Sequence, residues 1–176
     1  MNLLNKILDQ IDSTPLSISV MSKLTNNSKI HLFHELKNIN VSDYDYIISI
    51  ILDKHNFGHY VIFIKTINNN WELYESYGMS LPELLRTFNY SGIRISEDDI
   101  YKTFGNNLKK NNIKHQSKKL DITTCGMHIS NRYYWKHLDN NKYNEFMRSV
   151  NSNLDNFVIL TNLNMFMDLM NSNASS

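Results

Sequence analysis

The clearest pattern of apolar residues along the chain lies in residues 44–52, where aromatic and branched side chains follow one another almost without a break. A strand that is apolar on both faces is typical of the interior of a sheet that is covered on both sides. Two β-rich stretches follow, residues 59–66 and 71–77, and the polar residues 67–70 predict a hairpin turn between them.

Apolar residues at helical spacing predict helices before and after these strands. Pro15 and Pro82 both suit the first turn of a helix, because proline lacks the N–H that such a position leaves unpaired. Residues 30–36 are ambiguous between strand and helix, and residues 100–113 have weak helical character. The predicted helices span residues 2–12, 15–24, 81–88, 125–138, 142–150 and 155–170. Helices, then strands, then helices predict an α+β fold in one domain, residues 1–176.

Composition and charge restrict the possible classes of protein. The 176 residues are 41% hydrophobic and 20% charged, which is typical of a globular chain, and the net charge of +1 gives no overall attraction to nucleic acid or anionic membranes. No apolar run reaches the roughly 18 residues that a membrane span needs, and the N-terminus lacks the regions of a secretory signal. We expect a monomer that is neither secreted nor membrane-bound.

The candidate chemistry begins at Cys125, which is the only cysteine and precedes Gly126 and an amphipathic run. A cysteine at a helix N-terminus has a stabilised thiolate, because unpaired N–H groups and the helix dipole favour negative charge there. A glycine beside it lets a substrate carbonyl approach the backbone. By composition alone, a lone buried cysteine that acts as a small apolar side chain is the favoured interpretation.

A reactive thiolate needs a histidine and a group that orients it. Among seven histidines, His59 follows Gly58 and opens the first hairpin strand, while Glu75 lies near the end of the second. The open end of the hairpin therefore carries both side chains, within a residue or two of each other along the ladder. We interpret Glu72, in the same strand, as a solvated edge charge.

An oxyanion stabiliser completes such a site, and a side-chain amide is a common one. Gln116 lies in a polar stretch shortly before Cys125 and is the candidate. Taken alone, one surface glutamine among many polar residues is the favoured interpretation.

These residues together resemble a known family. Gly58-His59-Tyr60, Tyr74-Glu75-Ser76-Tyr77-Gly78, Gln116 and Thr124-Cys125-Gly126 occur in the order found in adenovirus-type maturation cysteine proteases. The same clan includes the SUMO and ubiquitin-like-protein proteases. The likeness is strongest to the capsid-maturation proteases of virophages, polinton-like viruses and large DNA viruses of protists, and it covers residues 44–138.

The resemblance implies a papain-like or SUMO-protease-like fold, with a central mixed sheet and a nucleophile that opens a buried helix. It implies that His59, Glu75, Gln116 and Cys125 are catalytic and that Tyr60 lines the substrate cleft. The implied activity is cleavage of capsid or virion precursors after small residues such as Gly, with the enzyme in the virion and in the cytoplasm or virus factory of the infected cell.

The resemblance also bears on cofactors and partners. No cofactor is expected to be required. The adenovirus enzyme is stimulated by DNA and by a disulfide-linked peptide, but here that disulfide would consume Cys125, so this route is disfavoured. A cluster of basic side chains could contact DNA or an acidic substrate, although a solvated loop is the favoured interpretation. The cluster comprises Lys109, Lys110, Lys114, His115, Lys118 and Lys119.

Other functions remain open at this point. An isopeptidase that acts on host ubiquitin-like proteins would share the fold and the site, because such tails end in Gly-Gly. A non-catalytic virion or DNA-packaging protein could retain a protease fold. The pairs His31/His34 and His55/His59 superficially resemble metal ligands, but no cysteine pair or adjacent carboxylate completes them, so we expect no metal site.

Overall fold

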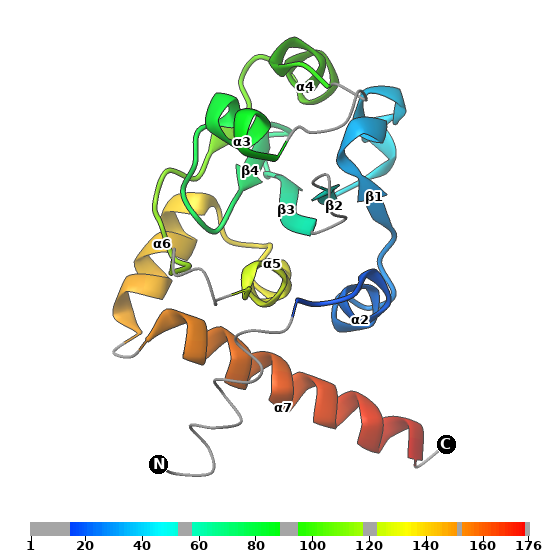
Figure 1. Ribbon diagram of the computed structural model, residues 1–176, viewed down its shortest axis with the longest axis vertical. Helices are drawn as coiled ribbons and strands as arrows, with labels where there is room; N and C mark the ends of the chain where they lie inside the picture. Colours follow the sequence, from blue (N-terminus) through cyan, green and yellow to red (C-terminus); the bar gives the residue numbers. More distant parts are fainter. Residues whose placement is uncertain (1–14, 53–57, 89–94, 118–122, 151–152, 175–176) are drawn as a thin grey trace.

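A mixed five-stranded sheet forms the centre of the chain, with helices on both faces (Figure 1). This computed structural model describes residues 15–52, 58–88, 95–117, 123–150 and 153–174. The strands are β1 (Ile30–Leu32), β2 (Tyr46–Leu52), β3 (Gly58–Lys65), β4 (Trp71–Tyr74) and β5 (Lys109–Lys110). The helices are α2 (Ile18–Leu24), α3 (Leu81–Phe88), α4 (Glu97–Phe104), α5 (Cys125–Tyr134), α6 (Asn140–Ser149) and α7 (Leu154–Ala174), with 3₁₀-helices η1 (Phe33–Asn38) and η2 (Val41–Asp43).

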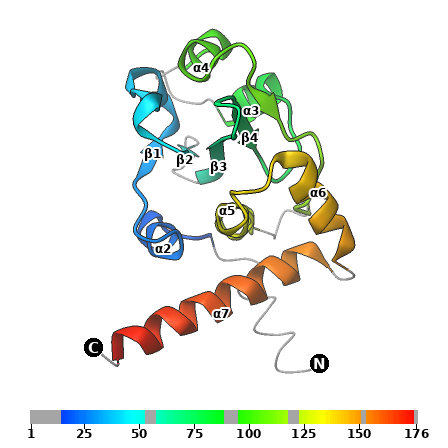
Figure 2. The same ribbon diagram turned by 180° about the vertical axis from the view of Figure 1, so that it is seen from behind.

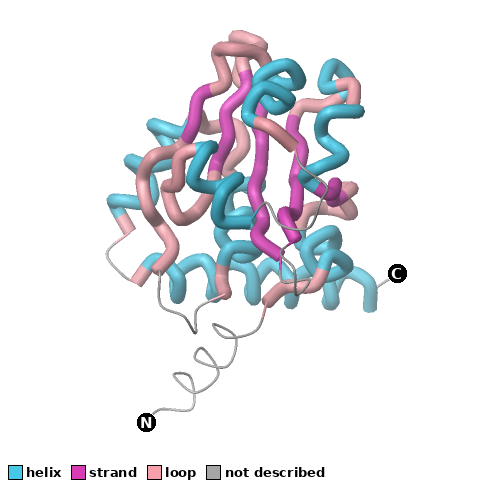
Figure 3. The backbone as a smooth tube through the Cα atoms, turned by 45° about the horizontal axis from the view of Figure 1, so that its top comes forward, coloured by secondary structure: helices cyan, strands magenta, loops and turns pink. Residues whose placement is uncertain are grey.

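The strands lie side by side in sequence order, β1 to β5. Figure 3 shows them in magenta at the centre of the chain. The outer pairs β1–β2 and β4–β5 are parallel, and the inner pairs are antiparallel. The predicted hairpin is confirmed as β3–β4, with Ile62 opposite Tyr74 and a turn in which Asn69 has a φ of 58°. The α+β class predicted from the sequence is therefore confirmed.

The apolar run of residues 44–52 is confirmed as an interior strand covered on both faces. Ile48 and Ile50 of β2 join one buried cluster, while Ile47 and Ile51 join another on the opposite face. Side chains of successive strand residues point to opposite faces, so a strand with two buried faces needs apolar residues at almost every position.

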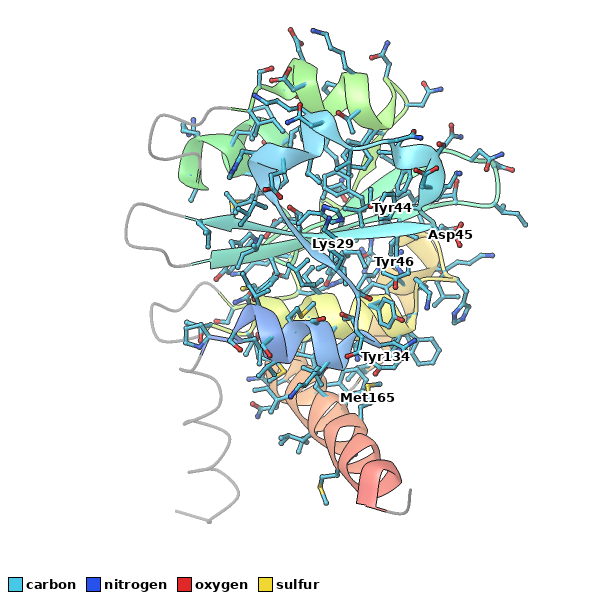
Figure 4. The ribbon with its side chains drawn as sticks, turned by 90° about the vertical axis from the view of Figure 1, so that its right-hand side faces the viewer. Lys29, Tyr44, Asp45, Tyr46, Tyr134 and Met165 are labelled. Carbon is cyan, nitrogen blue, oxygen red and sulfur yellow. The ribbon has the colours of Figure 1, made fainter. Side chains whose placement is uncertain are left out.

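Two hydrophobic clusters therefore sandwich the sheet. One is formed with α2, α5, α6 and the first half of α7, and the other with α3, α4 and η1. In Figure 2, α5 and α2 lie between the sheet and α7, whereas α4 lies beyond the opposite face. Figure 4 shows Tyr134 of α5 on the same side of the sheet as Tyr46 of β2, and the Tyr134 hydroxyl donates to the Leu24 carbonyl at 2.9 Å.

Several predicted elements need correction at their ends. Residues 30–36 contain both alternatives, because β1 runs directly into η1. β4 ends at Tyr74 rather than at residue 77, and α5 ends at Tyr134 rather than at residue 138. The helix predicted over residues 2–12 lies outside the described residues.

β5 was not predicted, since its two lysines carry no apolar strand pattern, yet it pairs with β4 and covers that edge of the sheet. Glu72 of β4 is consequently not a solvated edge charge, and that interpretation is wrong. The residue is only 4% exposed, and its carboxylate accepts a 2.6 Å hydrogen bond from the Asn140 N–H at the start of α6. An orphan helix N–H and a buried carboxylate thus satisfy each other.

None of the helices in the described part of the chain is long and apolar enough to span a membrane.

Candidate active site

Cys125 is the first residue of α5, as its sequence predicts. The helix packs against β3 on one side and α7 on the other. Thr124 precedes it, but the Thr124 side chain makes no capping bond to the helix. The positive end of the helix dipole therefore lies next to the thiol, which is largely buried.

Glu75 lies just beyond β4 and contacts His59 at the start of β3. Its Oε1 atom is 2.7 Å from Nε2 of His59, and both residues are buried. The carboxylate also accepts 2.8 Å bonds from the N–H groups of Tyr77 and Met79, which curl the chain around it and end β4. Gly78 makes this turn with a φ of +67°, and a Cβ there would lie 2.8 Å from the backbone at Ile113 and Lys114.

The His59 imidazole also hydrogen-bonds to the side chain of Cys125. The ring therefore bridges thiol and carboxylate, which is the arrangement predicted for these three residues. An orienting carboxylate, an imidazole and a nucleophile joined in this way are the common elements of Cys–His and Ser–His hydrolase sites.

Electrostatic interactions within this trio favour an ion pair. Burial by itself would lower the pKa of His59, but the hydrogen bonds to Cys125 and Glu75 outweigh it and raise that pKa to about 9. Burial by itself would raise the pKa of Cys125, but the hydrogen bond and charge of His59 lower it below its ordinary value, with help from the backbone of Tyr60 and Gly126. At neutral pH the arrangement favours thiolate and imidazolium.

Tyr77 belongs to the site although sequence reasoning assigned it no role. Its ring stacks on His59, with centroids 5.2 Å apart and planes 20° from parallel. Burial and the nearby charges of Cys125 and Glu75 raise the pKa of the Tyr77 hydroxyl to about 12, so it stays protonated. The position of Tyr77, two residues after the orienting acid in Glu75-Ser76-Tyr77-Gly78, was the only sequence signal for it.

Gln116 is buried and joined to the same turn. Ser76 Oγ donates to its Oε1 at 2.7 Å, and its Nε2 donates to the Tyr77 hydroxyl at 3.0 Å. The Gln116 N–H donates to the Ser76 carbonyl at 2.9 Å. These bonds fix the orientation of the amide. They also connect the amide to Tyr77, whose ring stacks on His59.

Tyr60 lies beside the thiol but inside the packed core. It is 2% exposed, and its hydroxyl donates to the Leu16 carbonyl at 3.0 Å. Leu16 in turn lies on Gly126, where a Cβ would be only 2.9 Å from a Leu16 methyl carbon. The glycine therefore makes room for Leu16, which differs from the role expected for it beside a substrate carbonyl. That Tyr60 contacts substrate stays a prediction.

The basic cluster predicted from the sequence is only partly a surface feature. Lys109 and Lys110 form β5, and the Lys110 ammonium donates to the Tyr101 hydroxyl. His115 is buried, and burial with nearby positive charge lowers its pKa to about 4, so it adds no charge at neutral pH. Lys118 and Lys119 lie outside the described residues. A contact with DNA stays a prediction.

Metal ligands do not gather in the part of the chain that the structure describes, where no three His, Cys, Asp or Glu side chains could hold an ion together. His31 is buried beside Tyr44, with ring centroids 5.6 Å apart, and His55 lies outside the described residues.

No protein-family model matches this sequence, and a search of the curated proteins finds no match either.

Proposed function

We propose that this chain is a cysteine endopeptidase of the adenovirus-type maturation class, with the papain-like fold that the SUMO proteases share. The observation that carries the proposal is the contact of one buried imidazole with both the Cys125 thiol and the Glu75 carboxylate. A buried lone cysteine that serves only to pack has no need of a histidine whose pKa is raised to about 9.

The reaction follows from the favoured charges of the pair. The Cys125 thiolate attacks the carbonyl carbon of the scissile amide, a C–S bond forms, and the carbonyl oxygen becomes an oxyanion. The Gln116 amide and the backbone N–H of Cys125 stabilise that oxygen, each donor being worth on the order of 10²–10³ in rate. The His59 imidazolium then gives its proton to the departing amine, the C–N bond breaks, and a thioester remains.

Hydrolysis of the thioester uses the same groups in reverse. Neutral His59 accepts a proton from water as the water oxygen attacks the thioester carbonyl. The C–S bond breaks, the acid product leaves, and the thiolate–imidazolium pair returns. Glu75 holds the ring orientation throughout and stabilises its charged form, and the stacked Tyr77 restricts rotation of the ring.

The proposed substrates are capsid or virion precursors cleaved after small residues such as Gly, within the particle or the infected cell. This part of the proposal rests on the resemblance of the four motifs alone. Cleavage of ubiquitin-like tails is the alternative outcome, since these also end in Gly-Gly.

A fluorogenic peptide that ends in Gly-Gly-aminocoumarin tests the activity without knowledge of the natural substrate. We expect the wild type to release the coumarin and Cys125→Ala to release none above the uncatalysed rate. Release that persists in Cys125→Ala would contradict the proposal. Incubation with a candidate capsid precursor, and separately with a ubiquitin-like vinyl sulfone, then distinguishes the endopeptidase from the isopeptidase.

A further inference from the structure

Asp155, the second residue of α7, is a buried carboxylate outside the trio. Its Oδ1 accepts hydrogen bonds from Thr124 Oγ1 at 2.6 Å and from His128 Nε2 at 3.0 Å. Its Oδ2 accepts a 3.1 Å bond from the Ser117 N–H. The described part of the chain thus offers this one side chain three donors, from two segments that are separate in sequence.

The donors flank the residues of the proposed reaction. Ser117 directly follows Gln116, and Thr124 directly precedes Cys125. His128 lies one turn further along the helix that Cys125 opens. One carboxylate therefore contacts both ends of the connection between the amide and the nucleophile.

We propose that Asp155 is a positioning residue that fixes the Gln116 amide relative to the Cys125 helix by binding both ends of the connection between them. The proposal rests on the proposed function. It explains how α7, whose residues lie far from the trio in sequence, takes part in the site, and Figure 1 shows α7 running beneath α5.

The hydrogen bonding of the Thr124 hydroxyl supports this role independently. Threonine at the position before a helix normally accepts a bond from a first-turn N–H. Here the Thr124 hydroxyl donates to Asp155 instead and makes no such cap. The first-turn N–H groups of α5 are therefore not occupied by the Thr124 side chain, and they remain near the thiol and the position proposed for the oxyanion.

Asp155 is ionised in this environment, as three donors require. Burial alone would raise its pKa, but the hydrogen bonds from His128 and Thr124 outweigh burial and hold that pKa below its ordinary value. Asparagine at this position has nearly the same shape but one oxygen and one NH₂ group, so it cannot accept from all the donors on both sides.

The test compares Asp155→Asn with the wild type in two reactions. Hydrolysis of the Gly-Gly-aminocoumarin peptide needs the oxyanion donors in place, whereas alkylation of Cys125 by iodoacetamide needs only the thiolate. We expect kcat to fall about tenfold or more in Asp155→Asn, since small misplacements of catalytic groups have such effects. The alkylation rate at pH 7 should stay within about twofold of wild type. Thr124→Val, which removes one donor and keeps the charge, should show a smaller change of the same kind.

Asn162→Ala is the matched control. Asn162 also lies on α7, is buried, and donates to the Met127 carbonyl of α5 at 3.0 Å, and among the described residues its side chain makes no hydrogen bond to Ser117 or Thr124. We expect this variant to melt at a lower temperature and to keep the wild-type ratio of hydrolysis to alkylation. If the ratio of hydrolysis to alkylation fell as much in Asn162→Ala as in Asp155→Asn, any weakening of the α5–α7 contact would impair hydrolysis selectively. That result would overturn the proposal.

Amide hydrogen exchange of Ser117, measured by NMR, tests the contact without any substrate. The Ser117 N–H should exchange about tenfold faster or more in Asp155→Asn and at the wild-type rate in Asn162→Ala. An unchanged rate in Asp155→Asn, or hydrolysis and alkylation that fall together in proportion to the unfolded fraction, would overturn the proposal. Failure of the wild type to hydrolyse the peptide would instead contradict the proposed function, and the exchange of Ser117 would still decide whether Asp155 holds this segment.

Discussion

The His59 side chain determines the chemistry of the site, because its two neighbours favour its charged form. A buried imidazole without partners would be neutral at pH 7, since burial disfavours charge. The hydrogen bonds to Cys125 and Glu75 reverse that preference and bring the pKa to about 9. A folded-state pKa above the ordinary 6.5 means that the stabilisation is complete below about pH 6.5 and is lost as the pH rises through about 9.

Removal of the thiol should therefore lower the pKa of the imidazole. In Cys125→Ala the bond to Glu75 remains, but the largest contribution that raises the pKa of His59 is lost while burial persists. We expect the His59 ring protons, followed by NMR, to titrate at lower pH in Cys125→Ala than in the wild type. Identical titration in both would show that thiol and imidazole do not interact.

Glu75→Gln removes the negative charge from His59 with little change in shape. The amide can accept only through its single oxygen, so the His59 ring and the N–H groups of Tyr77 and Met79 compete for that one atom. We expect kcat for the Gly-Gly peptide to fall on the order of 10²–10⁴-fold, because proton transfer by His59 is impaired when its orienting carboxylate is lost. Glu83→Gln, on the exposed face of α3, is the control and should retain wild-type kcat; an equal loss there would contradict the role of Glu75.

The sequence predicted which residues meet at the start of α5, from their order and their neighbours in the chain. Cys125, His59 and Glu75 follow from a lone thiol, a strand start and a hairpin end. Tyr77 and Asp155 could not be predicted, because their roles arise from ring stacking and from hydrogen bonds to residues as many as 38 positions away. Glu72 was misinterpreted for a related reason, since its partner Asn140 lies 68 positions along the chain.

The first turn of α5 packs so closely against Leu16 that no side chain fits at Gly126. Gly126→Ala should destabilise the fold by about 1–3 kcal/mol, because the new Cβ would lie 2.9 Å from Leu16 Cδ1 and 3.1 Å from its Cβ. Urea denaturation measures this. The same substitution made in a Leu16→Ala background should cost clearly less, and an equal cost in both backgrounds would contradict the contact.

Helices and strands with a regular pattern of apolar residues were predicted correctly. A strand that forms only by pairing with a neighbouring strand was not. The hairpin and the helix over residues 81–88 match β3–β4 and α3 because turn residues and a proline mark their ends. β5 consists of two lysines, and only their pairing with β4 makes them a strand. α5 ends early because the Arg132 guanidinium binds the carbonyls of Trp135 and Leu138, which turns the chain.

In the whole molecule, the trio comes from three separate segments that meet where α5 packs against β3. One hydrophobic cluster places α5 and α7 on the same face of the sheet. The other cluster packs against the opposite face of β2 and β3. The sequence predicted the α+β class and an interior strand, since these follow from local patterns. The packing of α7 against α5, which brings Asp155 to the site, is set by contacts between distant segments and was not predictable.

We expect His59 to make Cys125 a thiolate near neutral pH. The most direct measurement is the rate of iodoacetamide alkylation of Cys125 from pH 5 to pH 10, in the wild type and in His59→Ala. In the wild type we expect the rate to reach half its maximum below the ordinary thiol pKa of 9.0, because His59 lowers the pKa of Cys125. In His59→Ala only the backbone of Tyr60 and Gly126 opposes the effect of burial on the Cys125 pKa, so the midpoint should move to higher pH than in the wild type. The smaller thiolate fraction should slow alkylation at pH 7 about tenfold or more. Coincident profiles in the two proteins would show that His59 does not lower the pKa of Cys125.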